Sequence, residues 1–290
     1  MEADMTGSGR AMTILGVGCG LGARDGGCAD GPRALRRGGM GERLRGLTED
    51  LHCLELQAPL GDAQTVIPRL ADHLATLVAK ECGRGRFPIV IGGDHSCAMG
   101  TWAGLRQAHG AAFRLIWIDA HMDLHTPDTS PSGALHGMPL ACLLGLGPPG
   151  LARHPPVLTG TEVTLMGVRS WEPEEEARTS RHGIRVMGMA ELKRLGLAAA
   201  LAEATGPGDF GISLDLDAID PADAPGVGTP APGGIRADEL LDALAPLLAS
   251  PRCIGLEIAE YNPHHDIDQR TAALVETIVE AAIRSSGDPP

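Results

Sequence analysis

Residues 114–123, RLIWIDAHMD, join an apolar run to three polar side chains at alternate positions, Asp119, His121 and Asp123. In an extended strand, alternate residues share a face about 7 Å apart, so the segment delivers its charges to one side at its end. Ionised carboxylates beside buried strands are costly unless a cation or hydrogen bonds compensate them. A multivalent cation is the simplest compensation, and the segment predicts a buried strand that ends in a metal site.

The same spacing returns in ISLDLDAIDP, residues 212–221, which contains Asp215 and Asp217. A further histidine, His95, follows the apolar run PIVIGGD. Carboxylates and imidazoles without thiolates suit Mn²⁺, with Fe²⁺, Co²⁺ and Zn²⁺ as alternatives, whereas imidazoles disfavour Ca²⁺. Because six such groups are more than one ion commonly needs, we infer two ions that share bridging carboxylates.

Short apolar runs alternate with helical patterns along the chain. The runs begin at Thr13, Cys53, Pro88, Arg114, Val163, Ile184, Phe210 and Cys253. Between several of them, apolar residues recur at helical spacing, as in 67–77, 240–247 and 274–282. This alternation predicts an α/β fold with a mainly parallel sheet, helices on both faces and most strands buried on both faces. Ligands bind at the carboxyl ends of such strands, where His95, Asp119, Asp215 and Glu260 fall.

Composition narrows the class of protein. The 290 residues, 43% of them hydrophobic, suit one domain over 1–290, with 1–11 and 286–290 expected to be frayed. A net charge of −13 argues against nucleic-acid or anionic membrane partners. Seven cysteines without a CxxC pair, no leader pattern and no apolar span predict a cytoplasmic protein.

Several short motifs resemble those of the ureohydrolase family, which includes arginase and agmatinase. They are GGDHS at 92–96, DAHMD at 119–123, SGALHGMP at 132–139, SLDLDAIDP at 213–221, GTPAPGG at 228–234 and EYNP at 260–263. The resemblance covers nearly the whole chain and is closest to arginase. It implies a three-layer α/β/α sandwich around an eight-stranded sheet, a dinuclear Mn²⁺ centre, and a homotrimer or homohexamer.

The resemblance also implies a role for each candidate ligand. One ion would be held by His95, Asp119, Asp123 and Asp215, and the other by His121, Asp119, Asp215 and Asp217. Hydroxide formed between the ions would attack a guanidinium carbon and release urea and an amine. Asp123 would pass a proton to the departing amine, His136 would shuttle protons to solvent, and Glu260 would pair with the guanidinium.

The substrate-binding loops match the family less completely. His125 and Ala134 stand where arginases usually carry Asn for the α-carboxylate, whereas Ser132 is retained. Glu172 replaces the usual aspartate for the α-amino group and is one methylene longer. We hypothesise that His125 compensates through a charged contact to the carboxylate. The run WEPEEEAR, 171–178, is interpreted as the acidic start of a solvated helix rather than as a metal site.

L-arginine, cleaved to L-ornithine and urea, is therefore the first predicted substrate. A sister ureohydrolase acting on agmatine, guanidinobutyrate, guanidinopropionate or another guanidino acid would explain the altered loop positions. Formimidoylglutamate hydrolysis uses related chemistry. A metal-binding regulatory scaffold without turnover is the alternative from a different class, and the intact ligand set with His136 and Glu260 argues against it.

Overall fold

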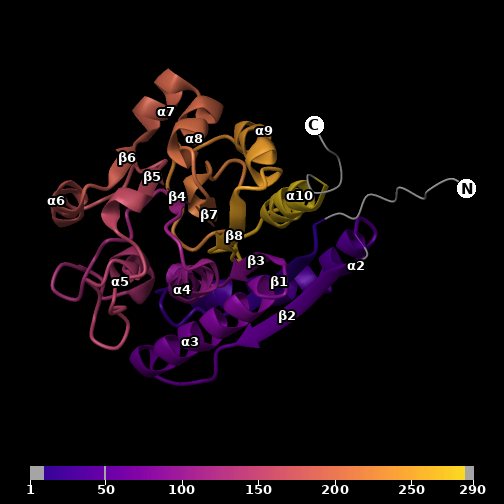
Figure 1. Cartoon of the computed structure of the whole chain (residues 1–290), viewed down its shortest axis with the longest axis horizontal. Coiled ribbons are helices and arrows are strands. Elements are labelled where there is room, and N and C mark those ends of the chain that lie inside the picture. The colour runs from indigo at the N-terminus through magenta and orange to yellow at the C-terminus, as the bar shows by residue number, and fades with distance from the viewer. Residues whose placement is uncertain (1–9, 49, 285–290) are drawn as a thin grey trace, which may run out of the picture.

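The computed structural model describes residues 10–48 and 50–284, and a sheet of eight strands forms its centre (Figure 1). The strands are β1 (Met12–Gly18), β2 (Leu51–Gln57), β3 (Phe87–Gly92), β4 (Arg114–Ile118), β5 (Val163–Met166), β6 (Arg185–Met187), β7 (Phe210–Asp215) and β8 (Cys253–Ala259). Every neighbouring pair is parallel, in the order β2-β1-β3-β8-β7-β4-β5-β6. Each of the eight apolar runs forms a strand, so the predicted α/β fold is confirmed.

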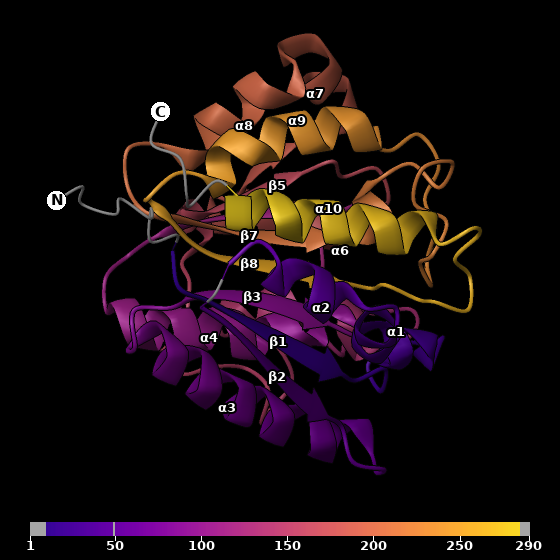
Figure 2. The same cartoon turned by 90° about the vertical axis from the view of Figure 1, so that its right-hand side faces the viewer.

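Helices cover both faces of the sheet and complete three layers (Figure 2). They are α1 (Gly31–Arg37), α2 (Met40–Arg45), α3 (Ala63–Cys82), α4 (Ala98–His109), α5 (Pro139–Leu143), α6 (Pro173–His182), α7 (Met189–Leu195), α8 (Leu197–Thr205), α9 (Ala237–Leu248) and α10 (Arg270–Arg284). One face packs against α3, α4 and α5, and the other against α1, α2, α8, α9 and α10. The three recurrent apolar patterns of the sequence correspond to α3, α9 and α10.

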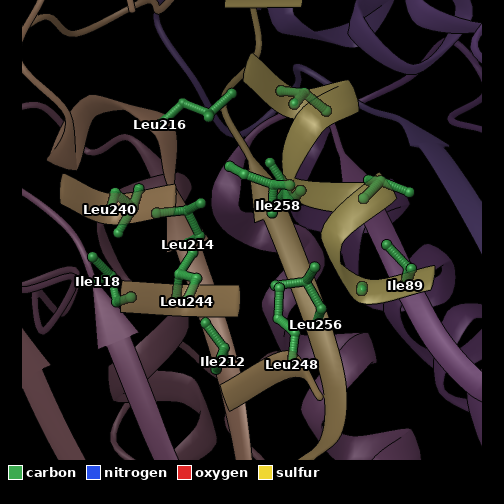
Figure 3. Packing of buried hydrophobic residues seen from close by; sticks show 14 of the residues in the cluster. Ile89, Ile118, Ile212, Leu214, Leu216, Leu240, Leu244, Leu248, Leu256 and Ile258 are labelled. Atoms are coloured by element: carbon green, nitrogen blue, oxygen red, sulfur yellow. The ribbon is translucent and has the colours of Figure 1, made fainter. Parts of the chain in front are cut away.

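The core between the sheet and α9 consists of interlocking Leu and Ile side chains (Figure 3). Strand residues Ile118, Ile212, Leu214, Leu256 and Ile258 face Leu240, Leu244 and Leu248 of α9, and each is at most 3% exposed. Burying one such side chain contributes about 1.5–3 kcal/mol, so this packing fixes the central strands firmly. Their carboxyl ends are therefore a rigid base for a site.

The edge strand β2 departs from the expectation that strands are buried on both faces. Leu51 is buried, but residues 52–55 are exposed, and β2 is the edge strand that pairs with β1 at the end of the sheet. The central strands β3, β7 and β8 are buried along their whole length. Of the four strands that lead to candidate ligands, these three are thus fully buried, and β4 is buried from Leu115 onward.

Residues 1–9 and 286–290, most of the stretches expected to be frayed, lie outside the described residues. The first described residue, Arg10, donates from Nη2 to the carbonyl of Cys253 over 2.8 Å, and its guanidinium lies over the Phe87 ring. All seven cysteines are free thiols. Within the described chain, no helix is long and apolar enough to cross a membrane.

Candidate active site

Four adjacent strands deliver the predicted ligands to one edge of the sheet. Strand β3 leads to His95 in a short 3₁₀ turn, β4 leads to the 119–123 segment, and β7 ends at Asp215, with Asp217 in the turn that follows. Strand β8 leads to Glu260. Because β3, β8, β7 and β4 are consecutive neighbours, all six predicted metal ligands meet. Five are buried, and the side chain of His121 is 28% exposed.

The six side chains form two groups that share Asp119. In the first, His95 Nδ1 lies 3.1 Å from Oδ2 of both Asp123 and Asp215, and 3.4 Å from Oδ2 of Asp119. In the second, His121 Nδ1 lies 3.1 Å from Asp217 Oδ2 and 3.5 Å from Asp119 Oδ1. Asp119 therefore reaches both groups with different oxygens.

The local backbone brings these residues together differently from the prediction. Strand β4 ends at Ile118, so Asp119, His121 and Asp123 lie in the loop beyond it and not at alternate positions of a strand. Asp119 Oδ1 accepts a hydrogen bond from His121 N at 2.7 Å, and Asp123 has a left-handed backbone, φ 53°. Side-chain-to-backbone turns of this type and a strained φ, rather than strand alternation, set the grouping.

The charges of the first group fit a cation. His95 Nδ1 and Asp123 Oδ2 are buried, 3.1 Å apart, and neither has a hydrogen-bond partner among the described residues. Burial, with repulsion from Asp119, raises the pKa of Asp123 to about 6, and burial also raises the pKa of Asp215 and Asp217. Buried polar atoms without hydrogen-bond partners, crowded by several carboxylates, are costly in an interior, and a shared metal ion removes that cost.

Glu260 and His136 meet beside this group. Oε1 of Glu260 accepts hydrogen bonds from His95 N and from His136 Nδ1, both at 2.9 Å. Glu260 has a left-handed backbone, φ 69°, and is buried. Burial lowers the pKa of His136, but the Glu260 carboxylate outweighs it and raises that pKa to about 9. A second strained backbone therefore aims a carboxylate into the site.

A model of the arginase family matches residues 10–284. The chain belongs to this family. The arginase of Bacillus caldovelox is 36% identical, over 93% of this chain and 97% of the relative. The native crystal structure of an arginase from that organism has a TM-score of 0.88 at 35% identity, covering 94% of this chain and 98% of that chain. A formimidoylglutamase structure from Bacillus subtilis, with a TM-score of 0.80 at 22% identity, covers 96% of this chain and 88% of that chain and shares the fold. The predicted family resemblance is confirmed.

In this member of the arginase family, a cavity of about 330 Å³ opens over the predicted metal ligands and is lined by four of them, His121, Asp123, Asp215 and Asp217. Its lining includes all the predicted substrate-binding positions except Glu260, namely His125, Ser132, Ala134 and Glu172. It also includes Arg24, Glu175 and Thr229, which sequence reasoning missed. A larger hollow of about 650 Å³, between α7, α8 and α9, contains none of the predicted site residues.

His125 is held by neighbouring side chains rather than directed freely into the cavity. Its Nε2 donates to Glu172 Oε2 at 2.9 Å, and its Nδ1 lies 3.3 Å from Thr129 Oγ1. The N–H of Ala134 donates to Ser132 Oγ at 3.1 Å. The hypothesised contact from His125 to a substrate carboxylate would therefore compete with Glu172.

Glu175 contradicts part of the interpretation of 171–178. The segment does begin α6, with Glu172 as its N-cap, and Glu174 is exposed as expected. Glu175, however, is only 2% exposed and accepts hydrogen bonds from Leu124 N and Glu172 N. Burial raises its pKa to about 8. The sequence did contain a signal that Glu175 turns back toward the backbone, because Glu172 and Glu175 have the three-residue spacing of a capping box.

Proposed function

We propose that this member of the arginase family hydrolyses L-arginine to L-ornithine and urea. The observation that carries the proposal is the pair of unpartnered buried atoms, His95 Nδ1 and Asp123 Oδ2, within a group of acidic side chains. That arrangement suits a cation, and metal-assisted hydrolysis is the chemistry that such a site performs. The family match over residues 10–284 supports a guanidino carbon–nitrogen bond as the target.

The proposed cofactors are two Mn²⁺ ions. His95, Asp119, Asp123 and Asp215 would hold one, and His121, Asp119, Asp215 and Asp217 the other. Imidazole and carboxylate ligands suit Mn²⁺ and are compatible with Fe²⁺, Co²⁺ or Zn²⁺. When bound, the ions lower the pKa of water, so that hydroxide is available near neutral pH.

The remaining chemistry belongs to side chains. Oε1 of Glu260 is engaged by His95 N and His136, and we assign its Oε2 to the substrate guanidinium, a charge-assisted hydrogen bond. Asp123, whose Oδ2 lies 3.1 Å from His95 Nδ1 in the first group, takes the proton of the attacking water and passes it to the departing amine. His136, with a pKa of about 9, is protonated at neutral pH and resupplies protons from the solvent side.

A guanidino amine without a carboxylate, agmatine, is the second candidate substrate. The observation that favours it is the part of the cavity formed by the loop around His125 and Ala134 and by the start of α6, here called the outer wall. There Glu172 and Glu175 offer acceptor oxygens, and His125 already donates to Glu172. Ala134 contributes only a methyl group. The Glu172 carboxylate would attract the distal ammonium of either candidate, whereas Arg24, Ser132 and Thr229 are among the donors that could reach the carboxylate of arginine.

Assembly and location complete the proposal. We propose a homotrimer or homohexamer on the basis of the family resemblance. The seven free thiols support a reducing, cytoplasmic location.

The test is product release from the metal-loaded protein. The protein is stripped of metal, loaded with Mn²⁺, and assayed for urea from L-arginine, agmatine, guanidinobutyrate and guanidinopropionate, and for formamide from formimidoylglutamate. We expect urea, with the highest kcat/KM for L-arginine. Higher kcat/KM for agmatine would replace the first candidate by the second. Absence of product from every compound, with both ions bound, would contradict the enzymatic proposal and favour the regulatory scaffold.

A further inference from the structure

A buried carboxylate outside the candidate ligand set lies behind His95. Glu257 of β8 is fully buried, and it is the register partner of Ser213 on β7. It accepts hydrogen bonds from Cys97 Sγ at 2.9 Å, Trp102 Nε1 at 2.7 Å and Ser213 Oγ at 2.8 Å. These three donors carry no charge, so Glu257 is a buried carboxylate with no cationic partner among the described residues, an arrangement that is costly to keep for packing alone.

The hydrogen bonds determine which group donates and which accepts at each contact between Glu257 and His95. An indole N–H can only donate, so Oε2 of Glu257 acts as acceptor for Trp102, and Ser213 donates its hydroxyl proton to the same oxygen. With its proton committed, Ser213 Oγ can only accept from His95 Nε2, 3.0 Å away. The Nε2–H tautomer leaves Nδ1 with a lone pair, and Nδ1 is the atom that faces Asp119, Asp123 and Asp215.

The orientation of the ring is fixed as well. His95 stacks on Trp117 with ring centroids 4.3 Å apart, and Trp117 Nε1 donates to Asp119 Oδ2 at 2.9 Å. Stacking sets the plane of the imidazole, and the Ser213 contact sets its rotation within that plane. A partner on the outer nitrogen is how proteins fix the tautomer of a metal-ligating histidine and raise its basicity.

We propose that Glu257 is a positioning residue for metal binding, acting through Ser213 to hold His95 with Nδ1 free to ligate an ion. This inference rests on the proposed metal site. Without the acceptor at position 257, the Ser213 hydroxyl can turn and donate to His95 Nε2, which moves the ring proton to Nδ1 and blocks that nitrogen. Glu257 itself touches neither the ion nor the substrate.

The experiment measures Mn²⁺ binding to metal-stripped protein, by calorimetry and by the electron paramagnetic resonance signal of free Mn²⁺. We expect Glu257→Met, which has no acceptor of comparable strength, to weaken the affinity of one ion by about 10- to 100-fold. Glu257→Gln keeps a carbonyl toward Trp102 and Ser213 and loses only the charge, so its loss should be less than tenfold. Trp102→Phe is the matched control, since it removes a hydrogen bond from Glu257 but leaves Ser213 in place, and it should retain wild-type affinity.

A double variant separates positioning from general loss of stability. If Glu257 acts through Ser213, Glu257→Gln should weaken Mn²⁺ binding in the wild-type background and cause no further loss in a Ser213→Ala background. This cycle also decides the question if Glu257→Met does not fold. Wild-type affinity in Glu257→Met, a loss equal to that of Trp102→Phe, or additive losses in the cycle would each overturn the inference. Failure of the wild-type protein to bind Mn²⁺ would instead contradict the proposed function.

Discussion

The inner and outer walls of the cavity are built in different ways. The inner wall comes from the ends of four central strands, and five of its six candidate ligands are at most 6% exposed. The outer wall comes from the loop around His125 and Ala134 and from the start of α6, where the side chain of Glu172 is 45% exposed. Exposed loop positions tolerate substitution at little cost in stability, whereas buried charges must be matched as a set. We therefore propose that the inner wall fixes the chemistry and that the outer wall governs substrate choice.

The largest expected loss of metal binding and activity follows substitution of Asp119, the residue that both ligand groups of the inner wall share. Asp119→Ala should lower the bound Mn²⁺ per chain and reduce urea release to background, because each group loses a carboxylate oxygen. Metal content by atomic absorption and urea release are measured on the same sample. Asp128→Ala, an exposed aspartate of the outer loop, is the control and should retain both. Full metal content in Asp119→Ala would break the account of the inner wall.

The next effect concerns the inner carboxylate assigned to the guanidinium. Glu260→Gln should lower kcat/KM for L-arginine roughly 10- to 150-fold, because a charged hydrogen bond contributes about 1.5–3 kcal/mol. Steady-state kinetics of the Mn²⁺-loaded variant give the number, and Glu176→Gln on the exposed side of α6 is the control. An unchanged kcat/KM would show that the guanidinium binds elsewhere.

The His136–Glu260 pair predicts a pH dependence of stability in the metal-free protein. The pKa of His136 is raised to about 9 in the fold, from 6.5, so its charge stabilises the native state fully below pH 6.5, and this contribution is lost as pH rises through 9. The free energy of unfolding relative to that of His136→Asn should therefore be higher near pH 6 than at pH 10, by at most about 3 kcal/mol. Urea-denaturation curves at several pH values measure it. If the wild type instead gained stability relative to His136→Asn between pH 6 and 10, the proposed stabilisation by the His136 charge would be contradicted.

The smallest expected effect is on the outer wall. The double variant His125→Asn, Ala134→Asn should raise kcat/KM for L-arginine relative to agmatine by roughly 5- to 30-fold, since two amide hydrogen bonds to a carboxylate contribute about 1–2 kcal/mol together. The ratio of the two kcat/KM values is the measurement, and activity toward agmatine serves as the internal control. An unchanged ratio would show that these positions do not read the carboxylate.

The inner wall was predictable because its chemistry is local in sequence. Apolar runs predict strands, and parallel strands bring their carboxyl ends to one edge of the sheet, so His95, Asp119, Asp215 and Glu260 are expected at that edge before the strand order is known. The strand order and the left-handed φ of Asp123 and Glu260 were not predictable, since they depend on tertiary packing. Alternation predicted that Asp119, His121 and Asp123 belong to one site, but its reason was wrong, because the three residues lie in the loop beyond β4 and divide between two groups.

The outer wall and the buried contacts of Glu257 behind His95 were harder to predict, because the residues that contact each other there are far apart in the sequence. Glu175 lies among exposed acidic residues, and its burial depends on the loop at Leu124, 51 positions away. Glu257 meets Trp102 of α4 and Cys97 of the 3₁₀ turn before that helix, which are separated from it by 155 and 160 positions. Only the relation between β8, β7 and α4 shows why a glutamate occupies an apolar strand.

The central claim is that the inner wall, and not the outer one, holds the metal. The outer wall carries a competing set, His125, Glu172 and Glu175, whose potential ligand atoms lie within 4.8 Å of one another. Anomalous diffraction at the manganese edge from crystals soaked in Mn²⁺ decides between the two walls. The account predicts two peaks, one beside His95, Asp123 and Asp215 and the other beside His121 and Asp217. A single inner peak would contradict the dinuclear assignment, and a peak at the outer set with the inner wall empty would contradict the claim itself.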